Sequence, residues 1–286
     1  IIAADININF DNQGKIKDNY QINGLAKNIR LDLLNKSSVK DLNFSFNITK
    51  NKFSLDNVSA VFNKIKLSAP LIQIKEINSL YSISGTVLNK NQNLEGKNIE
   101  SILGNLFDSS DIKKIKLSST NNFSFTINKK LKFSDFVLES SVDLEQLTFI
   151  KNDLNLEFFL LDTKEEINLE NHKIKINYNK KKLTIDGRGD IFLTNNIEKI
   201  SYNVNKNSDQ FLFDTKLNIK NNPLIIKFLD YEKKKGVNSI ISINGDLKKN
   251  GSIKFKSISL KENKNKILIS NFCLLYTSDA ADEEDS

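Results

Sequence analysis

The 286-residue chain contains no Met or Trp, one Cys, one His and two Pro. A lone His with no second His or Cys near it makes a poor metal site, so we expect His172 at the surface. Without Trp, and with only six Tyr, there is little material for the aromatic girdles of an outer-membrane barrel. No run approaches the roughly 18 to 20 apolar residues of a membrane-spanning helix. Because the chain has no initiating Met, we expect it to be a fragment of a longer protein.

Arginine is also scarce, although the chain is basic. Lys and Arg number 42 against 35 acids, a formal net charge of +7, but Arg30 and Arg188 are the only arginines. Arg is the residue best suited to bidentate contacts with bases and phosphates. The lysines are spread along the chain on the polar side of alternating segments, which is typical of a solvated face. We therefore expect no nucleic-acid partner.

The last fourteen residues differ in composition from the rest. Residues 273–286 (CLLYTSDAADEEDS) hold the only Cys and five acids, but no Lys, Asn or Ile. Most of this segment resembles the translation of a sequencing-library adapter. We therefore interpret 273–286 as a non-native tail and 1–272 as the native segment.

The clearest strand signal is the stretch Ile240–Leu260. Ile241, Ile243 and Leu247 alternate with polar residues, and alternation resumes at Ile253 and Phe255 after Asn250-Gly251. The alternation then shifts by one residue, so that the apolar positions after Phe255 are Ile258 and Leu260. Alternation on both sides of an Asn-Gly pair predicts a β-hairpin with one apolar and one hydrated face.

Similar alternation recurs along the chain and indicates on the order of 18 strands joined by short turns. Strands so close in sequence favour antiparallel pairing of neighbours. The predicted fold class is mainly β: a long curved antiparallel sheet, open like a taco and forming a β-groove, with one or two short amphipathic helices.

An apolar-x-Ile-x-Gly pattern ends at four glycines, Gly24, Gly85, Gly187 and Gly245. A glycine within a strand leaves a gap or permits a bend. The spacing suggests a loose repeat of about 60 residues with one irregular member.

Two segments have helical rather than alternating periodicity. Ile99, Ile102, Leu103 and Leu106 follow Asn98, a suitable N-cap. The second begins at Asn222-Pro223, carries a stripe from Leu224 to Leu229, and ends near Gly236. Both predict short amphipathic helices, either packed against a sheet or, less favoured, lying on a membrane surface.

The sequence contains no constellation of catalytic residues. Local acid pairs such as Glu165-Glu166 fall on predicted turns rather than in a concave site, which general acid–base catalysis needs. There is no P-loop, dinucleotide fingerprint or nucleophile elbow. We therefore expect no enzyme activity, no catalytic residues, no metal site and no cofactor.

The order of elements from Asn222 to Asn271 resembles the C-terminal region of the AsmA-like family, of the TamB and YhdP type. It runs from a short apolar segment (PLIIKFLDYEKKKG) to a strand with Ile-x-Gly (SIISINGDL), an Asn-Gly turn and two strands (SIKFKSISL and KILISNF). The upstream strands are similar to the family in style. The resemblance covers about 50 residues by motif.

The resemblance implies a periplasmic protein anchored in the inner membrane by an N-terminal helix that this fragment lacks. It implies a β-groove that holds phospholipid acyl chains and serves transport between inner and outer membranes and envelope integrity, with unidentified envelope protein partners. The candidate lining comes from the alternating strands: Phe44, Phe46, Phe123, Phe125, Leu156, Phe158, Phe211, Phe213, Ile241, Ile243, Ile253 and Phe255. The alternative is a structural or adhesive surface β-protein without lipid transport, whose apolar face a second sheet would cover.

Overall fold

The computed structural model describes residues 1–32, 38–95, 112–150, 160, 163–207, 210–248 and 253–274. Fifteen strands form one antiparallel sheet in chain order, from β1 to β12 and then β15 to β17. The sheet is open, with β1 and β17 as its edge strands. The mainly β prediction is therefore confirmed. By internal contacts the chain divides into two compact units, residues 1–152 with 168–180, and residues 153–167 with 181–286.

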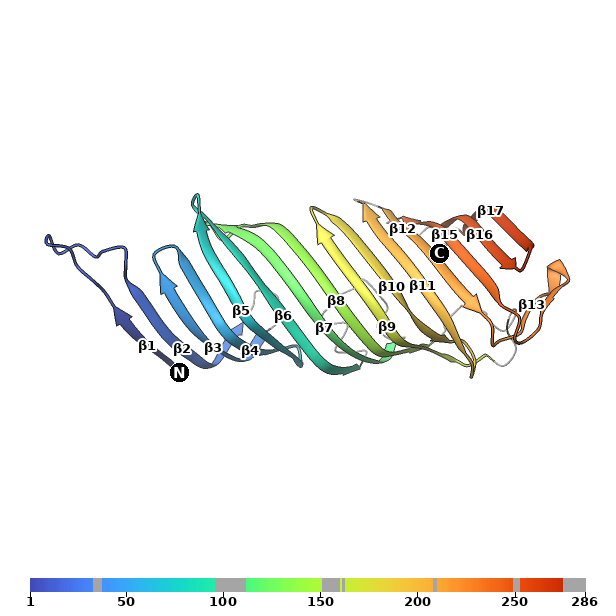
Figure 1. Cartoon of the computed structure of the whole chain (residues 1–286), viewed down its shortest axis with the longest axis horizontal. Coiled ribbons are helices and arrows are strands. Elements are labelled where there is room, and N and C mark those ends of the chain that lie inside the picture. Colours follow the sequence, from blue (N-terminus) through green and yellow to red (C-terminus); the bar gives the residue numbers. More distant parts are fainter. Residues whose placement is uncertain are drawn as a thin grey trace, which may run out of the picture. The chain divides into compact units, whose positions relative to one another are not determined.

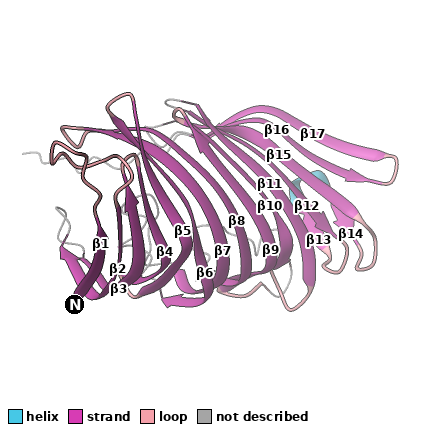
Figure 2. Cartoon of the chain, turned by 60° about the vertical axis from the view of Figure 1, so that its left-hand side comes forward, coloured by secondary structure: helices cyan, strands magenta, loops and turns pink. Residues whose placement is uncertain are grey.

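Unit 1 contains β1 to β8 and nearly all of β9, and tight turns join β3 to β4, β4 to β5, β5 to β6 and β7 to β8 (Figure 1). Figure 2 shows its longer strands bending along their length. Its strands are β1 (Ile2–Asn7), β2 (Gln21–Asp32), β3 (Ser38–Thr49), β4 (Lys52–Phe62), β5 (Ile65–Ile77), β6 (Leu80–Glu95), β7 (Ile112–Asn128), β8 (Phe133–Ile150) and β9 (Glu166–Asn179).

Unit 2 contains the remaining strands and one turn of 3₁₀ helix. β13 and β14 pair only with each other, as a short hairpin between β12 and β15. Its elements are β10 (Lys182–Phe192), β11 (Ile197–Asn207), β12 (Gln210–Ile219), β13 (Leu224–Ile226), η4 (Lys227–Leu229), β14 (Tyr231–Lys233), β15 (Ser239–Lys248), β16 (Ile253–Glu262) and β17 (Asn265–Leu274).

The hairpin predicted for Ile240–Leu260 is confirmed as β15 and β16, which pair antiparallel. The change of phase has a structural cause. Asn244 pairs with Ser257 but Gly245 pairs with Phe255, so Lys256 is an extra residue, a β-bulge. The bulge returns Ile258 to the apolar face, opposite Ile243.

The helix predicted from Pro223 to Gly236 is wrong. The segment instead forms β13, the three-residue η4 and β14, with Asp230 in the left-handed region at φ 47°. Apolar residues in a row suit a helix or a short strand equally, and here hydrogen bonds to the neighbouring sheet decide the outcome. The other predicted helix, Ile99–Phe107, lies outside the described residues. β17 extends to Leu274 and so includes the first two residues of the expected tail, Cys273 and Leu274, and residues 275–286 lie outside the described part.

Candidate functional site

The register of unit 1 aligns apolar residues into rows that cross strand after strand. One row consists of direct cross-strand partners from β1 to β7: Ile6, Ile22, Ile48, Phe53, Ile74, Ile83 and Phe125. The next row on the same face contains Gly24, Phe46, Leu55, Ile72, Gly85, Phe123 and Leu138. We call the surface they form the apolar face of unit 1. Side chains of successive residues point to opposite sides, so the row between them is polar: Asn23, Asn47, Ser54, Gln73, Ser84 and Ser124.

β-Bulges keep the apolar face continuous along each strand. Asn28, Asp41, Asn57, Asn91 and Asn171 have φ between 48° and 54°, a region that Asn and Asp tolerate better than most residues. The register shifts beside the first four, so Ala26 and Ile29 both lie on the apolar face. The freed backbone N–H groups find side-chain acceptors: Asn28 donates to Asn43 Oδ1 (3.0 Å) and Asn91 to Ser118 Oγ (3.0 Å).

Aromatic rings contact one another along the apolar face of unit 1. Phe46 lies between Phe44 and Phe53, with ring centroids 6.2 Å and 6.3 Å apart. A longer series joins β7, β8 and β9 through centroid distances of 4.8 to 5.9 Å, in the order Phe123, Phe125, Phe133, Phe136 and Tyr178. Such ring pairs stabilise a sheet beyond the area that they bury.

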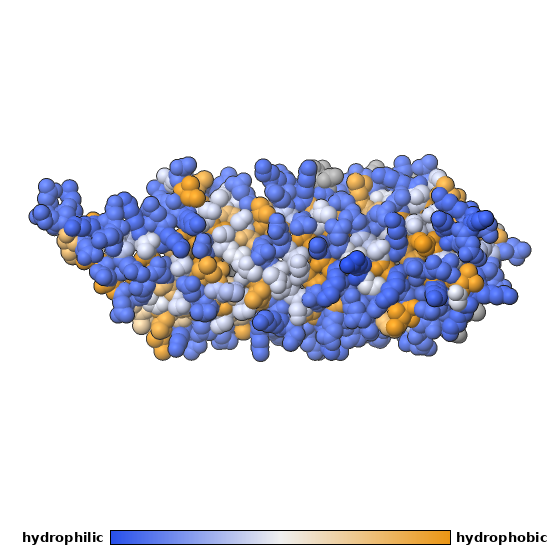
Figure 3. Space-filling view, viewed as in Figure 1, coloured by the Kyte–Doolittle hydropathy of each residue, from blue (hydrophilic) through white to orange (hydrophobic). Residues whose placement is uncertain are grey.

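Unit 2 has an apolar face built in the same way. One of its rows runs Ile185, Val204, Phe213, Gly245 and Phe255, and the next contains Tyr202, Thr215, Ile243, Ile258 and Ile269. The polar row beside them is Asp186, Asn203, Asp214, Asn244, Ser257 and Ser270. Figure 3, viewed as in Figure 1, shows mainly hydrophilic and near-neutral side chains over the described strands.

The structure brings most of the predicted lining residues onto these two faces. Phe44, Phe46, Phe123 and Phe125 share the apolar face of unit 1, while Phe211, Phe213, Ile241, Ile243 and Phe255 share that of unit 2. All nine side chains are half-buried rather than buried. Ile253 is paired with Leu247 in the same register. Leu156 and Phe158 lie outside the described residues.

Each repeated glycine lies opposite an aromatic residue of a neighbouring strand. Gly24 pairs with Phe46, Gly85 with Phe123, Gly187 with Tyr202, and Gly245 with both Phe213 and Phe255. A Cβ at Gly24, Gly187 or Gly245 would overlap one of these rings. At these three glycines the gap that the motif predicted accommodates a ring lying across the glycine, whereas at Gly85 the nearest atoms belong to Leu71 and Ile72.

A buried carboxylate on β11 holds the chain just before the hairpin β13–η4–β14. Glu198 is in phase with Ile200 and Tyr202 on β11, yet its side chain is buried. Its carboxylate accepts backbone N–H groups of Lys220 (2.8 Å), Asn221 (2.7 Å) and Asn222 (2.7 Å), and the Asn222 side-chain amide (2.8 Å). One carboxylate thus fixes the chain where it leaves β12. The sequence does carry a signal for this role, because Glu198 alternates in phase with the apolar residues Ile200 and Tyr202. Glu198 was not identified from the sequence.

A buried lysine holds the other side of this hairpin. Lys233 Nζ donates to the carbonyl oxygens of Asn222 (2.6 Å), Lys234 (3.3 Å) and Lys220 (3.4 Å). Burial lowers the pKa of this ammonium group, while the charges of Glu198 and Glu262 oppose that change. The hairpin is therefore fixed by charge-assisted hydrogen bonds.

Tyr231 attaches the hairpin to β16. Its hydroxyl donates to Glu262 Oε2 (2.6 Å), which also accepts the hydroxyl of buried Ser239 (3.0 Å). Burial and then the hydrogen bond to Glu262 raise the pKa of Tyr231 above its usual 10.0, against an opposing contribution from Ser239. The folded protein keeps this proton at a pH where the unfolded chain loses it.

This pKa shift predicts an alkaline effect on stability. A raised folded-state pKa contributes stability that is complete below the unfolded pKa of 10.0 and is lost as pH rises through the folded value. We expect Tyr231→Phe to be less stable than wild type by about 1 kcal/mol at pH 9, and this difference to shrink above pH 10. Urea unfolding of both proteins from pH 9 to 11.5 checks it; a difference independent of pH would contradict the assignment.

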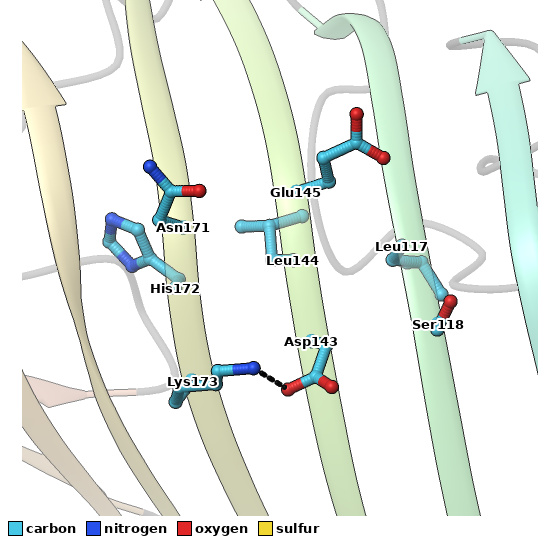
Figure 4. Close-up of a pocket in the computed structure, with 8 residues that line it drawn as sticks. All are labelled: Leu117, Ser118, Asp143, Leu144, Glu145, Asn171, His172 and Lys173. Atoms are coloured by element: carbon cyan, nitrogen blue, oxygen red, sulfur yellow. Dashed lines mark hydrogen bonds and ion pairs between the residues drawn. The ribbon is translucent and has the colours of Figure 1, made fainter.

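A pocket of about 290 Å³ lies across β7, β8 and β9 in unit 1. Figure 4 shows its lining, in which Lys173 forms an ion pair with Asp143 (2.7 Å). His172 also lines it and is fully buried, so the prediction of a surface histidine is wrong. His172 alternates in phase with Ile174 and Ile176 on β9, between exposed Asn171 and Lys173, so local alternation alone places it on the side of these isoleucines. A mixed ion pair and a single imidazole give this pocket no recognisable reaction chemistry.

The described residues contain no group of three His, Cys, Asp or Glu side chains placed to hold a metal ion. Within the same part of the chain, no helix is long and apolar enough to span a membrane. Comparison with protein-family models, curated proteins and solved structures finds no match to this chain.

Proposed function

We propose that the apolar faces of this chain hold the hydrocarbon chains of lipid. In this proposal the chain is a segment of an AsmA-like periplasmic protein, anchored in the inner membrane, that conducts phospholipid between inner and outer membranes. The observation that carries it is the row from Ile6 to Phe125, seven apolar partners on seven consecutive strands. Six of the seven are half-buried and Ile6 is exposed, so the row offers a hydrocarbon-like surface.

Transfer energetics support this role. Exposing an acyl chain to water costs about 0.8 kcal/mol per methylene, or roughly 12 kcal/mol for sixteen carbons. An apolar surface that continues from strand to strand removes much of that barrier without any reactive group. The polar Asn, Ser and Gln row on the other side keeps the sheet hydrated.

The alternative function, a structural or adhesive β-protein, predicts a covered apolar face. Apart from the large sheet, the strands in the described residues form only the short β13–β14 pair. The partial exposure of Phe44, Phe46, Phe123 and Phe125 favours lipid binding over this alternative. A cooperative melt unaffected by lipid would favour the scaffold.

A charge placed on the apolar face tests the proposal. We expect purified wild-type protein to carry phospholipid in native mass spectrometry and to take up a fluorescent phospholipid. Phe125→Glu places a carboxylate in the apolar row and should reduce uptake at least about tenfold, because burying a charge against hydrocarbon is costly.

Ser124→Glu is the matched control, since Ser124 is the adjacent residue on the polar side of β7. We expect its uptake to stay within about twofold of wild type. Circular dichroism establishes that both variants fold. Absence of both bound lipid and lipid uptake in the wild type would overturn the proposal, as would equal uptake by the two variants.

A further inference from the structure

The apolar face of unit 1 is interrupted by four polar side chains on β6, β7 and β8. Asn89 pairs with Ser119, and Asn121 pairs with Ser140. Ser119 and Ser140 are buried, and we call these four residues the polar belt. By register, Val87 and Phe123 adjoin the belt on one side and Leu117 on the other.

Asn121 joins most of the belt together. Its Nδ2 donates to Ser119 Oγ (2.9 Å) and to the Val87 carbonyl (3.1 Å), and its Oδ1 accepts the hydroxyl of Ser140 (2.6 Å). Asn121 therefore has protein partners on both ends of its amide. The hydrogen bonds link β7 to both of its neighbours, β6 and β8, and hold the belt in place.

Asn89 differs, because its Oδ1 is buried and has no hydrogen-bond partner. A buried acceptor without a donor destabilises a folded protein, and such atoms are rare. Asn89 as a whole is only half-buried, so rotation of its side chain can bring the amide to the surface of the apolar face. A hydrogen-bond donor held among the neighbouring apolar side chains would satisfy this oxygen.

We propose that the polar belt is a subsite for a hydroxyl group carried on a lipid acyl chain, with Asn89 Oδ1 accepting its proton. The inference rests on the proposed lipid binding and names a chemical class within it. A hydroxyl supplies the donor while the hydrocarbon on either side of it contacts Leu117 and Phe123. A phosphate or ammonium headgroup fits less well, since all four belt side chains are uncharged and provide no counter-ion.

Matched fatty acids test the subsite with the full chain. The probes are stearate and its 3-, 10- and 12-hydroxy derivatives, whose affinities are measured by displacement of a fluorescent fatty acid. We expect wild type to bind at least one hydroxystearate about three- to tenfold tighter than stearate, the range that one net hydrogen bond provides. Asn89→Leu should bind all four alike and keep its affinity for stearate.

Thermal unfolding separates this role from a structural one. If Asn89 lacks a partner in the free protein, Asn89→Leu melts at a higher temperature than wild type; a lower melting temperature would mean that the amide already has a partner and would overturn the inference. Asn122→Leu, on the opposite side of β7, is the control and should keep the preference for hydroxystearate.

The binding results distinguish the two proposals. Wild type that binds stearate without preferring any hydroxystearate contradicts the subsite and leaves the proposed function intact. Wild type that binds none of the four fatty acids also contradicts the subsite, and only the absence of bound phospholipid and of phospholipid uptake would overturn the proposed function as well.

Discussion

Replacing Glu198 by alanine is expected to lower the free energy of unfolding of unit 2 by about 4 kcal/mol. The carboxylate accepts the backbone N–H groups of Lys220, Asn221 and Asn222, which alanine would leave without partners. It also lies near Lys233, whose ammonium group would lose a compensating negative charge. Urea unfolding followed by circular dichroism measures the change, and hydrogen exchange assigns it to the strands of unit 2.

Glu232→Ala is the control for this prediction. Glu232 lies on β14, in the same hairpin, but its side chain is exposed. Its replacement should change stability by no more than about 0.5 kcal/mol. If Glu198→Ala and Glu232→Ala unfold at the same urea concentration, Glu198 does not fix the hairpin as its hydrogen bonds indicate.

The second large effect is expected for Gly245→Ala, which should destabilise unit 2 by about 3 kcal/mol. A Cβ at Gly245 would overlap the backbone carbonyl oxygen of Lys254 and come within 2.8 Å of Phe213 Cζ. The carbonyl belongs to the paired strand β16, so it can move only if the β15–β16 ladder moves with it. The same unfolding measurement reports the loss.

Gly187→Ala provides the contrast. Its new Cβ would meet the outer atoms of the Tyr202 ring, and a side chain can turn away more easily than a strand can shift. We expect Gly187→Ala to lower the free energy of unfolding by about 1 kcal/mol. Adding Tyr202→Leu should restore most of that loss. Adding Phe213→Leu to Gly245→Ala should recover little. If Phe213→Leu restores as much stability to Gly245→Ala as Tyr202→Leu restores to Gly187→Ala, then the Phe213 ring, and not the Lys254 carbonyl, limits the space at Gly245.

The sequence predicts those parts of the fold that depend on local alternation. Ile241, Ile243 and Phe255 share a face as expected, and the change of phase before Ile258 corresponds to the bulge at Lys256. Such features are predictable because side-chain direction follows directly from position along a strand.

Other features depend on partners distant in sequence and were missed. Leu224 and Ile225 form a strand because Glu198, more than 20 residues earlier, binds the backbone of Asn222. The unpartnered Oδ1 of Asn89 depends on which side chains of β7 lie opposite it. The alternation of apolar and polar residues along one strand carries no information about such contacts between distant residues.

The bulges also determine which mutations the sheet can absorb. Exchanging one apolar residue for another at Ile72 or Ile83 leaves every side chain on its original side. Deleting Asn57 would instead carry the residues between the bulge and the next turn to the opposite side, so that Ser59 and Val61 would replace Val58, Ala60 and Phe62 there. Over evolutionary time such a protein can accept substitutions at most positions, while the number of residues between each turn and the next bulge stays fixed.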